Sequence, residues 1–428
     1  METSASQRTT GRAAFIAVTT LFFAWGFITS LIDPLVAAVK GIFTLTDLQA
    51  QTSAFAFFIA YGLVSFPAAA VIAKWRAVPS ILAALAMMVI ACVIMLGAAN
   101  IANYNLVLLG LFVLASGITI LQVAANPLAA ALGDPEKSHF RLTLAQTFNS
   151  FGTIIGPFLG ASLFLSGVEV AEGVELTEEV RNNALLGIDR AYFWICGLLI
   201  LLLVFFFLAR KTVANAAPPI GSGKNIGQLI GDAFSSRWAL IGASAIFLYV
   251  GAEVAIGTQM ALFLNSENTW GIDLQTAAKY VSYYWGGAFV GRLVGTALLY
   301  RFKATNLLAI FTAVAALMCL FVFSVGGVTA GYVALAIGLF NSIMFPVIFT
   351  LTLERSTATE EATSAMLCTG IIGGALIPLL VGAVSDATSY TFAFLVPAAC
   401  YLMLCFFAFS AGKVVPVKKM AEDAATFH

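Results

Sequence analysis

Long apolar segments alternate with short polar connections along almost the whole chain. A helix that crosses a lipid bilayer needs about 20 predominantly apolar residues. Twelve segments come close to that length or exceed it, and they cover residues 15–38, 50–73, 78–99, 104–132, 140–166, 189–209, 238–264, 277–300, 305–325, 331–353, 362–385 and 389–411. The pattern predicts an all-α membrane protein with twelve transmembrane helices.

The connection at 210–237 is the longest in the chain, and its centre reads APPIGSGKN. Proline, glycine and serine in close succession are typical of a linker. We therefore expect a six-helix half at 1–210, a cytoplasmic linker at 211–237 and a second six-helix half with a short cytoplasmic tail at 238–428.

The two expected halves share local features. The fifth segment contains GTIIGPFLG (152–160) and the eleventh contains IIGGALIPLLVG (371–382). The fourth and tenth segments each carry an asparagine and a proline, at Asn126, Pro127, Asn341 and Pro346. A proline removes a backbone donor, and lipid tolerates this only where neighbours or a water-filled cavity satisfy the freed carbonyl. Two six-helix repeats with irregular helices at matching positions are typical of a secondary transporter with its site between the halves.

Composition supports the membrane assignment. The mean hydropathy is +0.98, 61% of the residues are hydrophobic and 10% are charged, and a soluble protein of this size could not bury so much apolar surface. The formal net charge is zero, so no basic surface is available for nucleic acid. The six cysteines stand singly within apolar runs, and we expect free thiols rather than disulfides or metal ligands.

Lysine and arginine are unevenly distributed over the connections. With the N-terminus inside, 16 of the 21 basic residues fall on the cytoplasmic side, in agreement with the positive-inside rule. Both termini are therefore predicted to be cytoplasmic, in a multi-pass protein of the inner (plasma) membrane. The polar start METSASQRTTGR has no signal cleavage site, so the first segment is expected to remain as an anchor.

Amide side chains recur at helical spacing on the fourth and fifth segments. Gln122 and Asn126 are four residues apart, and Gln146 and Asn149 are three apart, so each pair shares a helix face. An unpartnered amide in lipid costs roughly 2–7 kcal/mol. The pattern favours two faces that line a polar cavity and bind substrate. The alternative is a set of hydrogen bonds that only hold helices together.

Two carboxylates lie within apolar segments at equivalent places in the two halves. They are Asp33, in TSLIDPL, and Glu253, in YVGAEVAIG. Burial disfavours the charged form of a carboxylate, so either could bind and release a proton near neutral pH. Asp33 could instead be a helix-breaking residue before Pro34, and Glu253 could be a permanent acceptor for a substrate hydroxyl.

Other polar and aromatic residues carry weaker signals. Arg292 is expected to be structural, by snorkelling or by pairing with Glu354, and His139 is expected to make a hydrogen bond in a connection. The aromatics Trp25, Tyr61, Tyr283, Tyr284 and Trp285 could offer ring faces to a substrate. The sequence contains no Walker loop, no Gly-x-Ser-x-Gly elbow and no metal-ligand spacing, which argues against ATP-driven transport and against an enzyme.

Several runs resemble a known family. They are AANP (124–127), HFRLTLAQTFNSFG (139–152), YVGAE (249–253), GR (291–292) and SDA (385–387). On these runs the chain resembles the major facilitator superfamily, and within it the fucose permease and glucose/galactose transporter branch of sugar porters. The resemblance implies the twelve-helix fold in two pseudo-symmetric halves, transport by alternating access and a hexose-like substrate.

The resemblance also assigns roles to individual residues. Asp33 matches a proton-coupling aspartate of the fucose permease, whereas Gln122 stands where that permease has a second essential carboxylate, a glutamate. A glutamine cannot titrate, so the coupling scheme of the fucose permease does not transfer unchanged. Glu253 matches the glutamate that is typical of the glucose/galactose members, and Phe345 stands in place of a tyrosine.

We therefore expect a secondary active sugar transporter, a proton symporter of a hexose or N-acetylhexosamine that acts as a monomer without a cofactor. Asp33 and Glu253 are the expected proton carriers. An amide offers both donors and acceptors, as a sugar hydroxyl does, so the expected sugar ligands are Glu253 and the amides Gln122, Asn126, Gln146, Asn149 and Asn341. The alternatives are an uncoupled or sodium-coupled sugar facilitator and, more remotely, a non-transporting receptor or an intramembrane enzyme.

Overall fold

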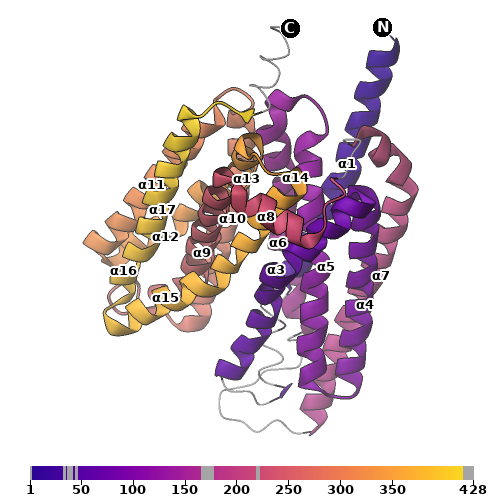
Figure 1. Ribbon diagram of the computed structural model, residues 1–428. Coiled ribbons are helices and arrows are strands. Elements are labelled where there is room, and N and C mark those ends of the chain that lie inside the picture. Colours follow the sequence, from indigo (N-terminus) through magenta and orange to yellow (C-terminus); the bar gives the residue numbers. More distant parts are fainter. Residues whose placement is uncertain are drawn as a thin grey trace. The chain divides into compact units, whose positions relative to one another are not determined.

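The computed structural model describes residues 2–31, 35, 42–43, 47–164, 178–217 and 222–417. Every regular element within these ranges is a helix (Figure 1). Asp33, one of the two expected proton carriers, lies outside the described residues.

The first six apolar segments each correspond to one long helix. These are α1 (Glu2–Ser30), α3 (Asp47–Trp75), α4 (Ala77–Asn100), α5 (Tyr104–Ala131), α6 (Ser138–Phe164) and α7 (Glu178–Ala216). A short 3-10 turn, η1 (Pro135–Lys137), connects α5 to α6.

The last six segments also form helices, and three of these are interrupted. They are α9 (Arg237–Asn265), α10 (Leu274–Leu299), α11 (Ala304–Val325), α12 (Gly327–Asn341) with α13 (Met344–Arg355), α14 (Glu360–Thr369) with η2 (Gly370–Ile372) and α15 (Gly373–Ala387), and α16 (Tyr390–Ala393) with α17 (Leu395–Lys413). The expected linker contains a helix of its own, α8 (Ile226–Ser235).

Among the described residues, ten helical stretches are long and apolar enough to cross a membrane. Helices α6 and α10 are not among these apolar stretches. Both carry polar residues, such as SHFRLT at the start of α6. These two helices hold some of the residues singled out for function, which explains their lower hydropathy. The chain is therefore a multi-pass membrane protein.

The chain forms two compact units. Unit 1 contains Met1–Leu128 and Phe148–Gly223, and unit 2 contains Ala129–Thr147 and Lys224–His428. The end of α5, η1 and the first part of α6 thus belong to unit 2. The division into 1–210, 211–237 and 238–428 stays a prediction.

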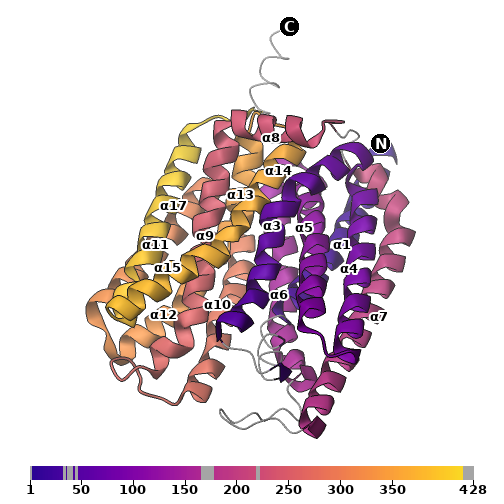
Figure 2. The same cartoon turned by 60° about the horizontal axis from the view of Figure 1, so that its bottom comes forward.

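Unit 1 is built around pairs of long helices. In this unit α4 and α7 lie side by side, α1 packs on α7, and α3 packs on α4 (Figures 1 and 2). The buried face of α4 is made of small and flexible apolar residues at helical spacing, including Ala84, Met88, Cys92 and Met95. Such a face lets neighbouring helices approach closely.

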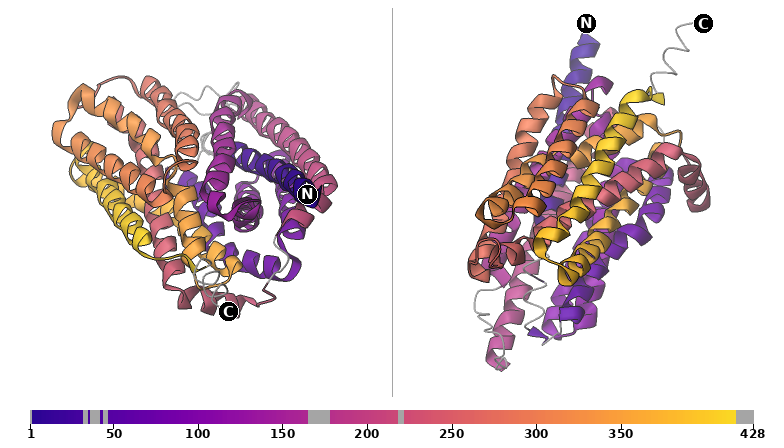
Figure 3. Two further views of the ribbon diagram at one scale, coloured as in Figure 1. Left: turned by 90° about the horizontal axis from the view of Figure 1, so that it is seen from above. Right: turned by 90° about the vertical axis from the view of Figure 1, so that its left-hand side faces the viewer.

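Unit 2 is organised around α9. This helix packs against α10, α13, α14, α15 and α17. On the periphery, α11 and α17 run side by side, as two further views show (Figure 3). The central position of α9 explains why a carboxylate on it, Glu253, is partly enclosed by other helices.

Candidate functional site

In unit 1, the two amides of α5 lie on a buried face. Gln122 is 8% exposed and Asn126 is fully buried. The Nε2 of Gln122 donates a hydrogen bond to the hydroxyl of Tyr61 on α3, at 2.9 Å. From the sequence, Tyr61 was expected to offer its ring face to a substrate. In the structure its hydroxyl accepts a hydrogen bond from the amide of Gln122.

Asn149, also in unit 1, lies where α6 crosses α1. Its Nδ2 donates to the carbonyl of Phe22 on α1 at 3.1 Å. The helices approach closely here because Gly26 has no side chain, and a Cβ at Gly26 would overlap the backbone and amide of Asn149. One N–H of this partly buried amide therefore bonds to the backbone of α1. Every such amide also has a second N–H and an oxygen that can accept a hydrogen bond.

In unit 2, Glu253 lies next to a chain of polar groups. The hydroxyl of Tyr284 on α10 donates to the backbone carbonyl of Glu253 at 3.0 Å. The same hydroxyl accepts from the Nδ2 of Asn341, at the end of α12, at 2.5 Å. Tyr284 and Asn341 are fully buried, and the Oδ1 of Asn341 has no hydrogen-bond partner among the residues that the structure describes. A buried acceptor without a partner costs about 1–3 kcal/mol and is a place where a ligand or water would bind.

Two further tyrosines were not expected from the sequence. Tyr249, one turn before Glu253 on α9, is buried, and its hydroxyl has no hydrogen-bond partner among the described residues. Tyr401 lies on α17, which packs on α9, and its buried hydroxyl also has no hydrogen-bond partner in the described part of the chain. The spacing of four residues between Tyr249 and Glu253 could have revealed the first tyrosine, whereas nothing in the sequence connects α17 to α9.

Arg292 on α10 is 8% exposed. Its Nε donates to the carbonyl of Ser342 at 2.7 Å, and its Nη1 donates to the carbonyl of Gln146 on α6 at 3.2 Å. Gln146 is itself 5% exposed. The expected pairing of Arg292 with Glu354 is therefore wrong, because Glu354 pairs with other residues.

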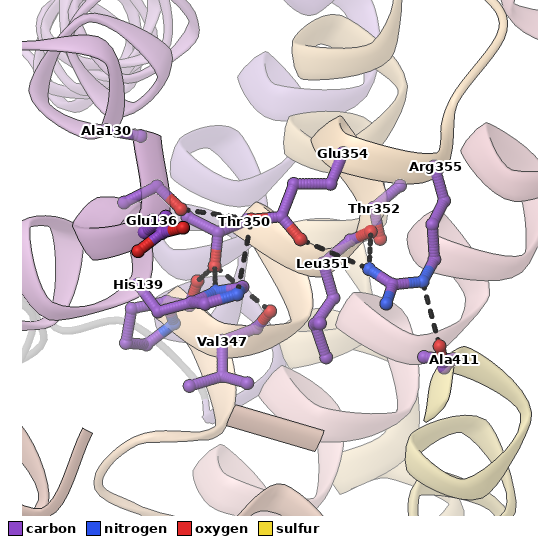
Figure 4. A network of polar contacts seen from close by, with 12 residues as sticks. Ala130, Glu136, His139, Val347, Thr350, Leu351, Thr352, Glu354, Arg355 and Ala411 are labelled. Atoms are coloured by element: carbon purple, nitrogen blue, oxygen red, sulfur yellow. Dashed lines mark hydrogen bonds and ion pairs between the residues drawn. The ribbon is translucent and has the colours of Figure 1, made fainter. Parts of the chain in front are cut away.

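Glu354 belongs to a second polar network in unit 2 (Figure 4). Its Oε1 lies 3.2 Å from the Nε2 of His139 and accepts from the Oγ of Ser138 at 3.0 Å. Its Oε2 lies 3.2 Å from the Nη1 of Arg355, whose Nε donates to the carbonyl of Ala411 at 2.9 Å. This network ties the start of α6 to α13 and α13 to the end of α17.

His139 lies between Thr350 and Glu354. Its Nδ1 lies 2.5 Å from the Oγ1 of Thr350, and its Nε2 faces a carboxylate oxygen of Glu354. His139 therefore makes the expected hydrogen bond, and it also contacts Glu354, which the sequence did not reveal.

Outside the spanning helices, Asp232 on α8 anchors the linker helix to α14. Its Oδ2 accepts from the Nζ of Lys224 at 2.8 Å and from the backbone N and Oγ1 of Thr359, the residue before α14, at 2.9 and 2.8 Å. Burial raises the pKa of the Asp232 carboxyl, but these hydrogen bonds outweigh it and leave the pKa below its ordinary value.

The expected site residues thus fall into two sets. Gln122, Asn126 and Asn149 lie in unit 1, and Gln146, Glu253 and Asn341 lie in unit 2. Within unit 2, Tyr284 joins Glu253 to Asn341. That both sets line one substrate cavity stays a prediction. Among the described residues, no group of His, Cys, Asp or Glu is arranged to hold a metal ion.

Comparison with known proteins agrees with this architecture. The Major Facilitator Superfamily matches residues 14–370. A glucose/galactose transporter of Brucella abortus biovar 1 (strain 9-941) is 39% identical over 401 residues, which cover 94% of each chain. The L-fucose-proton symporter of Escherichia coli (strain K12) is 32% identical over 413 residues, which cover 92% of each chain.

A solved structure is similar along almost its whole length. The crystal structure of FucP, a Major Facilitator Superfamily transporter in the outward conformation, superposes with a TM-score of 0.83 at 30% identity, over 94% of this chain and 99% of that one. The predicted resemblance and the all-α fold of twelve membrane-spanning segments are thereby confirmed, and the family is one of transporters and not of enzymes. The chain belongs to the Major Facilitator Superfamily.

Proposed function

We propose that this protein is a secondary active transporter that moves a sugar together with a proton by alternating access. The observation that carries this proposal is a partly enclosed acidic residue, Glu253, on the central helix of unit 2. Its backbone carbonyl accepts from the buried hydroxyl of Tyr284, which in turn accepts from the buried amide of Asn341. The names of its relatives support it, since they include glucose/galactose transporters and L-fucose-proton symporters.

The chemistry of the buried polar groups suits a sugar. Sugar hydroxyls donate and accept hydrogen bonds, and the amides Gln122, Asn126, Gln146, Asn149 and Asn341 can do both. The unpartnered Oδ1 of Asn341 is an acceptor that a hydroxyl would satisfy. A hexose or an N-acetylhexosamine fits this set of groups.

Glu253 and Asp33 are the proposed proton carriers. An ionisable residue in a membrane-spanning helix is costly and is a functional candidate by default. Glu253 can take up a proton when the sugar binds and release it on the other side. No cofactor is required, because the proton gradient supplies the driving force.

The proposed cellular setting follows from charge distribution. The protein is placed in the inner (plasma) membrane with both termini in the cytoplasm, because most basic residues then lie inside. A single chain holds both sets of proposed ligands, so the proposed transporter acts as a monomer in contact with membrane lipid.

The test is transport in proteoliposomes that contain the purified full-length protein. Labelled D-glucose, D-galactose, L-fucose and N-acetyl-D-glucosamine are screened by counterflow, and proton uptake on sugar addition is recorded. Wild type should exchange at least one sugar and take up protons with it. Glu253→Gln should keep counterflow but lose proton-driven accumulation. The control, Glu267→Gln, removes an exposed carboxylate and should behave as wild type.

Three results would contradict parts of the proposal. Sugar exchange without proton movement would favour the uncoupled facilitator, and accumulation that follows a sodium gradient would favour sodium as the coupling ion. If Glu253→Gln still accumulates sugar as wild type does, Glu253 is only an acceptor for hydroxyls and Asp33 works alone.

A further inference from the structure

We propose that the linker helix α8 lies in the interface between lipid and water and binds the bilayer with one apolar side. That side is made of Ile226, Ile230 and Phe234, which we call the α8 stripe. The partner is the lipid itself, at the level where headgroups meet acyl chains. The surface is separate from the groups proposed for sugar and proton, so the inference holds whatever the protein transports.

The first observation is the distribution of buried and exposed side chains around α8. Leu229 and Ala233 are fully buried, and α8 packs on α9 and α14. In contrast, Ile226, Ile230 and Phe234 are 44%, 38% and 60% exposed. Residues four apart lie in one row along a helix. The three exposed apolar side chains therefore form a continuous stripe next to the side that is buried in the protein.

The remaining exposed side of α8 has a different character. It consists of small or polar residues, namely Gly227, Gln228, Gly231 and Ser235. Helix α8 thus has one side against the protein, one apolar side and one side suited to water. A helix that lies in a lipid interface sorts its exposed residues in this way, with the apolar side in the hydrocarbon and the polar side in water.

The second observation is the depth at which α8 is held. The stretches Gly327–Arg355 and Glu360–Ala387 are each long and apolar enough to span a membrane, so the connection at 356–359 between them lies at a membrane surface. The Oδ2 of Asp232 on α8 accepts hydrogen bonds from the backbone N and the Oγ1 of Thr359 at 2.9 and 2.8 Å. These bonds hold the second half of α8 at that surface.

Ser236, 1% exposed, holds the end of α8 at the same connection. Its Oγ lies 3.0 Å from the Oγ of Ser356 and accepts from the backbone N of Thr357 at 3.2 Å. Ser236 is also the residue before α9, a helix that is itself long and apolar enough to span the membrane. Helix α8 therefore lies across the ends of spanning helices of unit 2, as Figure 2 shows.

The residues that follow α8 are typical of a lipid interface. Arg237 is exposed and Trp238 is half-buried, and basic and aromatic side chains gather at the level of the headgroups. The α8 stripe ends three residues before Arg237. Lipid is therefore the occupant that fits the stripe, because the same boundary that passes through Arg237 and Trp238 passes along α8.

Helix α8 is stabilised by its own cap. The Oδ1 of Asn225 accepts from the backbone N of Gln228 at 2.9 Å, and the Oε1 of Gln228 accepts from the backbone N of Asn225 at 3.0 Å. Such a reciprocal pair stabilises a helix from within the chain. Substitutions in the stripe should therefore change its contact with lipid and leave the helix in place.

The experiment measures how fast introduced cysteines react with a charged maleimide. The full-length protein is held in lipid nanodiscs, which leave both faces of the membrane open to water. Ile230→Cys and Phe234→Cys place a thiol on the stripe, and Ser235→Cys and Gly231→Cys are matched controls on the polar side. Labelling of wild type gives the background from its six native cysteines.

The stripe thiols should react about tenfold more slowly than the controls, because lipid excludes both a charged reagent and the thiolate that attacks it. The protein alone leaves Phe234 60% exposed, so burial in the protein cannot account for slow labelling there. Equal rates on the two sides of α8 would overturn the proposal. Two positions on each side keep the comparison decisive if thermal unfolding shows that one variant is destabilised.

Photocrosslinking separates lipid from a second copy of the chain. The photoreactive amino acid p-benzoylphenylalanine replaces Phe234, or Ser235 as the control, in vesicles of phosphatidylcholine and phosphatidylglycerol. After illumination, mass spectrometry should find the chain with one attached lipid for position 234 and the unmodified chain for position 235. A crosslinked pair of chains, or the absence of a lipid adduct at position 234, would overturn the proposal.

Discussion

Three of the amides in the two units each give one hydrogen bond to the protein. Gln122 donates to Tyr61, Asn149 donates to the backbone of α1, and Asn341 donates to Tyr284. These bonds fix the orientation of each amide, and an amide that gives one N–H still has a second N–H and an oxygen. Fixed donors and acceptors favour a ligand with many hydroxyls, because little side-chain entropy is lost on binding.

Gln122 offers the sharpest test at the scale of a residue. Gln122→Glu keeps the shape of the side chain but replaces the N–H donor with an acid. Burial disfavours the ionised form, so the acid should bind sugar as wild type does at low pH and more weakly at alkaline pH. Gln122→Met has a similar shape and no polar atoms, and should lose roughly 1–3 kcal/mol of affinity at every pH.

The measurement for this pair of variants is the sugar dissociation constant between pH 5.5 and 9. Over this range the dissociation constant of wild type should change less with pH than that of Gln122→Glu. If the Met variant binds as tightly as wild type, Gln122 only holds α5 to α3 through Tyr61. If the Glu variant shows no dependence on pH beyond that of wild type, position 122 is not a site of proton binding.

At the scale of elements, unit 2 is held together at points where a helix begins, ends or breaks. Glu354 joins the start of α6 to α13 (Figure 4), Arg292 bonds to the break after α12, and Asp232 joins α8 to the start of α14 (Figure 2). Helix ends leave backbone groups unpaired, so a few side chains at these points connect several elements at once.

The anchor at Asp232 should make stability depend on pH. The carboxyl has a pKa below its ordinary value of 3.8 in the folded protein, so its contribution is fully present above about pH 4 and is lost as the pH falls through the lower folded value. An asparagine at position 232 cannot titrate. The substitution Asp232→Asn should therefore lower the free energy of unfolding by roughly 1 kcal/mol between pH 5 and 8.

The measurement is thermal unfolding in detergent for wild type and Asp232→Asn from pH 8 down to pH 3. The gap between the two midpoints should be constant near neutral pH and should close below about pH 4. The exposed Asp386 provides the control variant, Asp386→Asn, which should match wild type. A gap that persists at pH 3 would show that the anchor does not depend on the charge of Asp232.

At the scale of the whole molecule, charge decides how the chain lies in the membrane. Basic residues near the ends of helices are retained on the cytoplasmic side. The connection at 265–273 contains no lysine or arginine, whereas that at 300–304 contains Arg301 and Lys303. The first is therefore expected outside and the second inside.

Alkaline phosphatase fusions test this orientation. The enzyme needs disulfides and is active only outside the reducing cytoplasm. A fusion after Asn268 should be active, a fusion after Lys303 should be inactive, and a fluorescent protein fused to the C-terminus should fluoresce in the cytoplasm. Activity in the reverse order would mean that the termini lie outside.

The sequence by itself determined the number and placement of the helices. Apolar segments long enough to span lipid must be helical, because lipid offers no partner for backbone groups, and the twelve predicted segments each match a helix or a pair of interrupted helices. The prolines also revealed irregular points in advance, since Pro346 follows the break between α12 and α13. The sequence likewise indicated that Glu253 and the amides are unusual, because polar groups in such segments are costly.

Only the tertiary structure decided which of these groups are partners. Arg292 bonds to Ser342 and Gln146 instead of the expected Glu354, because the glycine face of α10 brings it to the break that Pro346 creates. Helix α17, which carries Tyr401, packs on α9, which carries Glu253, although the two helices are far apart in the chain. Helical periodicity relates residues three or four apart on one helix, whereas contacts between helices depend on the packing of whole faces. The sequence can therefore show which side chains need a partner, and packing alone decides which partner each one finds.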